Sequence, residues 1–246
     1  RIPMGVDIKA FRRVAAAKRP DNLPVGVPLI LFVGRLAEKK GLRILIDALK
    51  WAPLEATGAH VIVIGDGPLM SQLVDHASRV GLAERIHFLG ARPHARLPAY
   101  LAASDVFALP SIQAADGDTD GLPVTLIEAA ACGIPAVASN IAGVPEFIVD
   151  GRNGRLVPPG DAKALASVLN ELLRSTRLRN VLGDAARKTA EAFDWSVIAT
   201  RYAEVLAKAL EGRATMIPCP VLSVDPVSNT TQRFGKDHRA HLSDRE

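Results

Sequence analysis

The chain has 246 residues, of which 48% are hydrophobic, 23% charged and 4% aromatic. This length and composition are typical of one large or two small globular domains, and they exclude the disordered, collagenous and disulfide-scaffold classes. The net charge of +4 is compatible with an anionic partner, but the basic residues form no stripe and few aromatic side chains are available for base stacking. We therefore expect a small anionic ligand and no nucleic acid.

The first six residues, Arg1 to Val6, include no apolar signal segment and do not begin with an initiator Met. We therefore expect the chain to begin inside a longer protein and to be cytoplasmic. Its apolar runs reach about five residues, far below the roughly 18 that cross a bilayer. Cys132 and Cys219 form no C-x-x-C pair, so we expect two free thiols in a reducing compartment.

From residue 29 onward, short apolar runs alternate with stretches in which apolar residues recur at helical spacing. This alternation is typical of a parallel sheet with helices on both faces, and it predicts an α/β, Rossmann-like fold. Ligands of such sheets bind beyond the carboxyl ends of the strands. The predicted strands are residues 29–33, 60–64, 86–89, 106–109, 135–138 and 155–157.

Helical spacing of apolar residues predicts helices around residues 42–49 and 69–80 between these strands. After residue 161 the strands cease, and we expect three helices near residues 165–173, 178–193 and 195–210. The remaining residues, 212–246, are poor in hydrophobic side chains, so we expect a disordered tail there. Residues 1–211 would then form one domain.

The first predicted strand is followed by a glycine and two cations. Gly34 and Arg35 come directly after the strand, and Lys40 precedes Gly41 at the start of a predicted helix. Glycine lets a bulky anion approach the backbone, and paired Arg and Lys side chains can clamp phosphate oxygens. The alternative is a solvated basic turn ahead of a helix.

The second predicted strand ends in the glycine-rich turn Ile64-Gly65-Asp66-Gly67-Pro68. This turn lacks the G-x-G-x-x-G spacing of a dinucleotide fingerprint, and the sequence contains no G-x-x-x-x-G-K-[ST] motif. Both absences argue against a nicotinamide site and a P-loop. Alone, the turn predicts only a strand-to-helix connection.

The most specific segment is residues 116–135, in which Asp120 and Glu128 form an Asp-x7-Glu pattern. Pro123 suits an early helical position, so the exposed amides around Val124 and Thr125 would attract an anion. Glu128 lies one turn inside the helix and suits a vicinal diol, because a carboxylate accepts two hydrogen bonds. Asp120 can serve a second polyol in the same way. The alternatives are an N-cap or Asx-turn role for Asp120 and a helix-surface position for Glu128.

Taken in order, these motifs resemble the carboxyl-terminal domain of the family 4 retaining glycosyltransferases, which have the GT-B fold. The resemblance covers about residues 1–211. It rests on Gly34-Arg35 with Lys40-Gly41, the 64–68 turn, Phe88-Leu89-Gly90, the segment from Asp120 to Glu128, Gly143-Val144-Pro145-Glu146-Phe147-Ile148, and Gly151, Asn153 and Gly154.

The resemblance implies that this domain binds a nucleotide-sugar donor, a UDP-, GDP- or ADP-sugar, without a cofactor. Arg35 and Lys40 would hold the diphosphate, Glu128 the ribose and Asp120 the transferred sugar, and Asp120, Arg35 and Lys40 are the candidate catalytic residues. The loop from Gly90 to Arg92 would border the nucleobase. The other expected donor-binding residues are Gly34, Gly65, Arg92, Gly121, Leu122, Pro123, Val124 and Thr125.

Two departures from the family pattern stand out. The family's Glu-x7-Glu is Asp-x7-Glu here, which shortens the first carboxylate by one methylene and puts the sugar identity or the transfer efficiency in question. The amino-terminal half, which supplies the acceptor pocket in this family, has no counterpart in the sequence. Neither His94 nor the pair His238 and His241 has the setting of a metal cluster, and we expect no metal.

The resemblance implies transfer of a sugar, with retention of anomeric configuration, to a saccharide or lipid-linked acceptor, as in bacterial polysaccharide or glycolipid biosynthesis. Lipid-linked acceptors leave peripheral association with the inner face of the membrane open. One alternative is a sugar-nucleotide-binding module that is inactive without a separate amino-terminal half. A second is a sugar-nucleotide epimerase or a phosphorylase of the same architecture.

Overall fold

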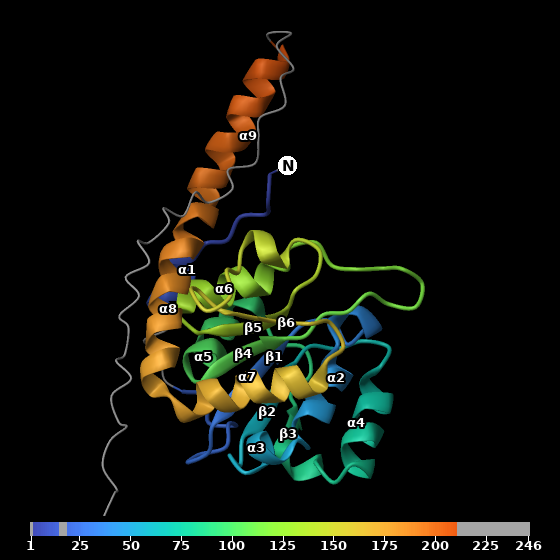
Figure 1. The fold of residues 1–246 in the computed structure, drawn as a ribbon. Helices are drawn as coiled ribbons and strands as arrows, with labels where there is room; N and C mark the ends of the chain where they lie inside the picture. The colour runs from blue at the N-terminus through green and yellow to red at the C-terminus, as the bar shows by residue number, and fades with distance from the viewer. Residues whose placement is uncertain (1, 15–18, 211–246) are drawn as a thin grey trace, which may run out of the picture.

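The computed structural model describes residues 2–14 and 19–210, and its centre is a parallel sheet of six strands (Figure 1). The strand order is β3-β2-β1-β4-β5-β6, the order found in dinucleotide-binding folds. The predicted Rossmann-like α/β architecture is therefore confirmed, and only β3 and β5 differ from the predicted bounds. The strands are β1 (Leu29–Val33), β2 (His60–Ile64), β3 (Ile86–Phe88), β4 (Val106–Leu109), β5 (Ala136–Ser139) and β6 (Arg155–Val157).

Helices cover both faces of the sheet (Figure 1). α2, α3, α4 and α7 form one contacting group, and α1, α5, α6 and α8 form the other. The sequence patterns did not predict three of these helices, α1, α3 and α5. All three precede α6 in the chain, and none of them has a long apolar face. The helices are α1 (Ile8–Val14), α2 (Leu42–Ala48), α3 (Ala52–Glu55), α4 (Met70–Arg79), α5 (Leu97–Ala102), α6 (Val124–Cys132), α7 (Ala162–Arg174), α8 (Thr176–Ala190) and α9 (Trp195–Leu210).

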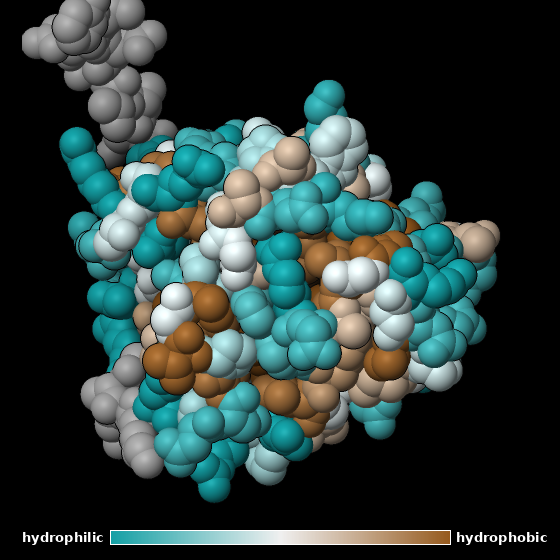
Figure 2. Space-filling model, turned by 90° about the horizontal axis from the view of Figure 1, so that it is seen from below, coloured by the Kyte–Doolittle hydropathy of each residue, from teal (hydrophilic) through white to brown (hydrophobic). Residues whose placement is uncertain are grey.

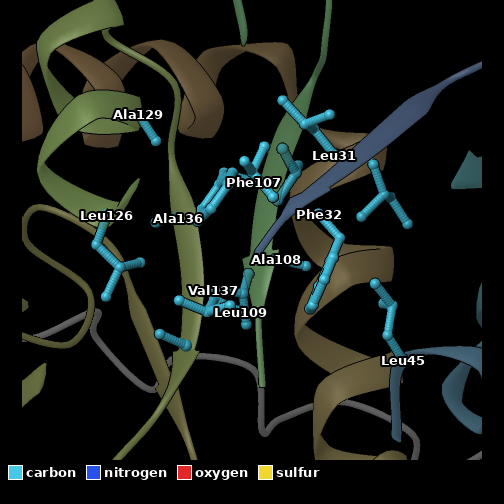
Figure 3. Close-up of a cluster of buried hydrophobic side chains, with 14 of the residues drawn as sticks. Leu31, Phe32, Leu45, Phe107, Ala108, Leu109, Leu126, Ala129, Ala136 and Val137 are labelled. Carbon is cyan, nitrogen blue, oxygen red and sulfur yellow. The ribbon is translucent and has the colours of Figure 1, made fainter. Parts of the chain in front are cut away.

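The core lies between the sheet and these two helix layers. Every residue of β1, β4 and β5 is buried, as expected for parallel strands that are covered on both faces. Figure 3 shows their side chains between Leu126 and Ala129 of α6 on one side and Leu45 of α2 on the other. The sheet is thus a rigid platform that fixes where its carboxyl-end loops begin.

The amino-terminal segment packs against the beginning of α9. The Val6 amide donates to the Phe193 carbonyl at 2.9 Å, and the Trp195 amide donates to the Val6 carbonyl at 3.1 Å. From there α9 extends away from the body of the domain (Figure 1), with Tyr202 and Leu206 exposed. The expected disordered tail, residues 212–246, lies outside the described residues.

The surface and the cysteines agree with a globular domain. Within the part of the chain that the structure describes, no helix is long and apolar enough to cross a membrane. On the face seen in Figure 2, teal hydrophilic residues separate small brown patches. Cys132 is free, as expected, and buried, and burial raises the pKa of its thiol to about 12, so it is not a nucleophile. Cys219 lies outside the described residues.

Candidate functional site

The loops that follow β1, β2, β3 and β4 are joined to one another beyond the carboxyl ends of these strands. The Leu36 amide donates to the Asp66 carbonyl at 2.9 Å, and the Gly65 amide donates to the Gly90 carbonyl at 3.0 Å. The Ile112 amide in the loop after β4 donates to the Lys39 carbonyl at 2.9 Å. Since β1 and β4 are the neighbours at which the strand order reverses, the loops meet where Rossmann-like sheets bind ligands.

Two glycines allow these loops to approach one another. Gly65 has a φ of +140°, and a Cβ atom there would lie 1.9 Å from the Gly34 carbonyl oxygen. Gly41 has a φ of +67°, and its Cβ would lie 1.8 Å from the Pro110 carbonyl oxygen. Side chains at either position would force the β1 loop away from its neighbours.

Gly34 lies beside the side chain of Lys40. The space beside it is lined by the aliphatic stem of Lys40, whose Cδ lies 3.6 Å from the position of an added Cβ. The structure therefore brings Gly34 and Lys40 together, and the stem of Lys40 lies beside the glycine backbone that an anion was expected to approach. A small side chain at residue 34 would meet only ordinary van der Waals contact.

Lys40 and Asp120, the expected phosphate and sugar ligands, contact each other. Lys40 Nζ lies 2.8 Å from Asp120 Oδ2, and the two side chains are 16% and 14% exposed. Asp120 Oδ2 is fully buried and has no aligned hydrogen-bond donor among the described residues, so the contact is an ion pair rather than a directional hydrogen bond. The proposed N-cap role for Asp120 is excluded, because the N-cap of α6 is Pro123.

Two members of this charged cluster, Lys39 and Asp118, were not predicted from the sequence. Lys39 Nζ lies 2.9 Å from Asp118 Oδ2 and 3.5 Å from Asp120 Oδ1. The hydrogen bond between Lys39 and Asp118 raises the pKa of the lysine and lowers that of the aspartate. The tandem of two lysines ahead of Gly41 was the available signal, but the path of the loop after β4 was not readable from the sequence.

Arg35 and Arg92 are exposed cations in the loops that follow β1 and β3. Arg35 follows Gly34 directly and forms no ion pair with any of the described residues, so its guanidinium is free to bind an anion. Arg92 makes only a long contact, 3.4 Å, from Nη1 to the Ala91 carbonyl oxygen. Both arginines lie in the loops where they were expected, and neither forms an ion pair with Asp120.

The N-terminus of α6 is open toward the same region. The helix begins at Val124, and Pro123 is its N-cap, one position earlier than the predicted helical proline. No side chain caps this end, and the Thr125 hydroxyl is buried without a hydrogen-bond partner among the described residues. An uncapped helix N-terminus attracts anions through its free amides and its dipole.

The loop after β5 supports the chain just before α6. A Cβ on Gly143 would lie 3.0 Å from the Leu122 amide nitrogen and 3.2 Å from the Gly121 carbonyl carbon. The preceding residue, Ala142, has a φ of +51°, which residues other than glycine rarely adopt. This close approach fixes the backbone of Gly121 and Leu122 in front of the helix.

Glu128 is buried in α6, so the helix-surface alternative is wrong. Its side chain is 6% exposed, and its Oε1 atom lies 2.7 Å from His94 Nε2. His94 begins the short 3-10 turn His94–Arg96, which follows the loop that was expected to border the nucleobase. From the sequence, His94 was considered only as a possible metal ligand, and its contact with Glu128 was not predicted. Among the described residues, no group of three or more potential metal ligands occurs.

The site therefore combines cations, an open helix end and two partly or fully buried carboxylates at one edge of the sheet. The cations and the helix end suit phosphate oxygens, and the carboxylates suit sugar hydroxyls. Without a ligand, Lys40 and Asp120 neutralise each other. Of the expected site residues, Lys40 and Asp120 contact each other, and Asp120 lies in the loop that leads into α6.

The sequence and the fold of the chain are similar to those of known proteins. The family model described as "Glycosyl transferases group 1" matches residues 14–189. HepE from Anabaena, whose crystal structure contains UDP and glucose, is 30% identical and superposes with a TM-score of 0.73, covering 84% of this chain and 56% of HepE.

Two relatives have names that describe their activity. The colanic acid biosynthesis glycosyltransferase WcaL of Salmonella typhimurium is 37% identical over 82% of this chain and 49% of its own length. The GDP-mannose-dependent phosphatidylinositol monomannoside mannosyltransferase of Mycolicibacterium smegmatis is 33% identical over 86% of this chain and 57% of its own. The chain thus spans about half the length of these relatives.

Proposed function

Because this chain belongs to the group 1 glycosyltransferases and has one half of their GT-B fold, we propose that it binds the nucleotide-sugar donor of a sugar transfer reaction. Residues 1–211 form this donor domain, and the acceptor is a saccharide or a lipid-linked molecule in polysaccharide or glycolipid biosynthesis. The proposal rests on one observation. Lys40 contacts Asp120 just ahead of the uncapped N-terminus of α6, and this helix carries the buried Glu128.

Each group has one role in donor binding. Arg35, Lys40 and the backbone N–H groups of Leu122, Val124 and Thr125 bind the diphosphate, because cations and the N-terminus of a helix attract phosphate oxygens. Glu128 accepts hydrogen bonds from the ribose, and Asp120 accepts them from the transferred sugar. Gly34, Gly65, Gly121 and Pro123 shape the backbone around them, and Arg92 borders the base.

In the proposed reaction, catalysis is largely electrostatic, and the sugar is transferred with retention of its anomeric configuration. As the bond between the sugar and the diphosphate breaks, negative charge grows on the departing oxygen, and Arg35, Lys40 and the helix end stabilise it. The acceptor hydroxyl attacks the anomeric carbon on the face that the diphosphate leaves, and its proton passes to the departing phosphate. We infer no metal ion and no covalent intermediate with a protein group.

The second half of the cleft lies outside this sequence. The chain covers 49% and 57% of the two relatives described above, which supports a donor domain that needs an amino-terminal partner for transfer. That partner lies on the same chain or on a separate one, and in the second case this chain is a binding module until the partner joins it. The named lipid acceptor of the mycobacterial relative supports a location at the cytoplasmic face of a membrane.

The test is ligand-induced stabilisation. With UDP, GDP and ADP each tried at about 100 times Kd, the matching nucleotide is expected to raise Tm by about 5–10 °C. Glu128→Ala and Arg35→Ala should each lose most of that shift, whereas Arg79→Ala, which removes an exposed cation from the end of α4, should retain it. If none of the three nucleotides stabilises the unaltered chain, the proposed function is wrong.

A further inference from the structure

His94, an exposed residue, contacts the buried carboxylate of Glu128. The distance from His94 Nε2 to Glu128 Oε1 is 2.7 Å, and because a carboxylate oxygen accepts, the imidazole N–H donates. A histidine ring can donate from Nε2 whether it is neutral or charged, so the contact does not require a protonated ring. The glutamate side chain is 6% exposed and the histidine 69%, so a surface group fixes a buried one.

A second contact orients the imidazole. Its ring meets the Phe11 ring edge to face, with centroids 5.4 Å apart and an interplanar angle of 71°. Phe11 is 1% exposed and belongs to α1, which packs on α6. Since both partners of His94 are anchored in the core, the ring has a defined position even though most of its surface is exposed.

Only one oxygen of the Glu128 carboxylate is used. Oε2 forms no hydrogen bond with any residue that the structure describes, and it is not among the fully buried orphan atoms. A carboxylate that is withdrawn from water needs several hydrogen bonds to offset its desolvation. Oε2 of Glu128 is therefore the atom that can accept the missing hydrogen bonds from a ligand.

We propose that His94 is a positioning residue for the ribose of the donor. By binding Oε1 it sets the rotation of the Glu128 carboxylate, so that Oε2 accepts from the ribose hydroxyls. The inference rests on the proposed function and extends it to a residue in a different loop, 34 positions earlier in the chain. His94 acts through Glu128, so its effect depends on the ribose hydroxyls and not on the base or the phosphates.

The test compares nucleotides with and without the ribose diol. UDP, GDP and ADP, each beside its 2′,3′-dideoxy analogue, are titrated calorimetrically into the 246-residue chain. His94→Ala is expected to weaken binding of the matching ribonucleotide about tenfold, which corresponds to about 1.4 kcal/mol, and to change the affinity for the dideoxy analogue less than twofold. His94→Gln, whose amide N–H can still donate, should recover part of the loss.

A double-mutant cycle locates the effect. In a Glu128→Ala background, His94→Ala should cause no further loss, because the residue acts only through that carboxylate. His76→Ala is the matched control: it removes another histidine–carboxylate pair, in which His76 Nε2 lies 2.6 Å from Asp47 Oδ1, and it should leave both affinities unchanged. The thermal midpoint of each variant shows whether it is folded.

Three results would overturn the inference while the proposed function stands. The first is a His94→Ala variant with unchanged affinity, and the second is tighter binding, which would make His94 a placeholder that the ribose displaces. The third is equal weakening of the ribonucleotide and its dideoxy analogue, which would indicate direct contact with base or phosphate. If the unaltered chain binds none of UDP, GDP and ADP, the proposed function fails first and the inference fails with it.

Discussion

In the proposed donor complex, Asp120 competes with the diphosphate for Lys40. Lys40 Nζ is 2.8 Å from its carboxylate, and Lys39 lies 3.5 Å from its other oxygen, so donor phosphates must draw Lys40 away from an existing partner. Because the two side chains are only 16% and 14% exposed, the phosphates must replace the carboxylate as the partner of Lys40, so that neither charge is left buried and unpaired. The same carboxylate repels the phosphates while it attracts the sugar hydroxyls.

This competition predicts opposite effects of one substitution on binding and on transfer. Asp120→Asn should tighten the binding of the free nucleoside diphosphate about two- to fivefold, because it removes a negative charge and frees Lys40. Calorimetry at low salt measures this gain, which should shrink as the ionic strength rises. Sugar transfer by the complete enzyme should fall, because the amide cannot replace the carboxylate at the sugar.

Asp116→Asn is the matched control for this prediction. Asp116 lies in the same loop and accepts a hydrogen bond from the Asp118 amide at 2.9 Å, and neither lysine contacts it. Its substitution should change nucleotide affinity by much less than that of Asp120. Weaker binding by Asp120→Asn than by the unaltered chain would mean that the carboxylate supports the diphosphate site and does not compete for it.

Site residues that belong to a local sequence pattern were predicted, whereas residues whose role depends on a partner far along the chain were not. Arg35, Lys40, Asp120 and Glu128 each stand out within a local pattern of glycines, a strand end or a helix start. His94 does not, because its contact with Glu128 depends on how the turn after β3 packs against α6, and the two residues are 34 positions apart. Lys39 was missed for the same reason, since its partner Asp118 lies in a long loop without regular structure.

Among the elements, the strands were the most predictable. Their apolar runs are buried on both faces, so the pattern continues over the whole strand. α3 and α5 have four and six residues, too few for helical periodicity to be distinguished from a loop. The strand order was not predicted, because it follows from the packing of helices that are far apart in the sequence.

Contact between the β1 and β2 turns predicts that two neighbouring glycines differ in their tolerance of alanine. Gly65→Ala should lower the free energy of unfolding by about 2 kcal/mol or more, because its φ of +140° and the Gly34 carbonyl oxygen 1.9 Å from the new Cβ both oppose a side chain. Urea denaturation monitored by circular dichroism measures the change.

Gly34→Ala serves as the control in this comparison, since its new Cβ would lie 3.6 Å from the nearest Lys40 carbon. We expect a change of stability below about 0.5 kcal/mol for this variant. Equal destabilisation by both substitutions would show that the β1 turn, and not its contact with the β2 turn, limits the stability of this edge.

The edge strand β3 and its neighbour β2 carry a pair of histidines that predicts a pH-dependent stability. His60 Nδ1 lies 2.8 Å from His87 Nε2, and burial lowers the pKa of both rings. The unfolded chain therefore takes up protons near its ordinary histidine pKa of about 6.5, while the folded chain still resists them. Stability should be full above about pH 7 and should fall as the pH decreases through 6.5 toward the lowered values.

Urea midpoints at pH 7.5 and 5.5 test this expectation. His87→Gln removes one ring and the charge that opposes protonation of His60, so the difference between the two midpoints should become smaller than in the unaltered chain. A variant whose midpoints differ as much as those of the original would assign the acid sensitivity to other groups.

For the whole molecule, the amino-terminal residues belong to the domain although the family match begins only at residue 14. Ile8 and Phe11 are 3% and 1% exposed, and the Val6 backbone pairs with the chain on either side of Asp194. α1 contacts both α5 and α6. The segment therefore joins the beginning of the domain to its last helix and supports the helix that carries Glu128.

Phe11→Ala should consequently affect both stability and the site. Truncation of a buried phenylalanine typically costs about 3–5 kcal/mol, and here it also removes the edge-to-face partner of His94. We expect a loss of about 3 kcal/mol in the free energy of unfolding, together with weaker ribonucleotide binding that His94→Ala does not weaken further. Met4→Ala, which truncates a side chain that is 57% exposed, should change neither quantity. If Phe11→Ala is destabilised but binds the ribonucleotide with full affinity, α1 supports the fold alone and the orientation of His94 does not depend on it.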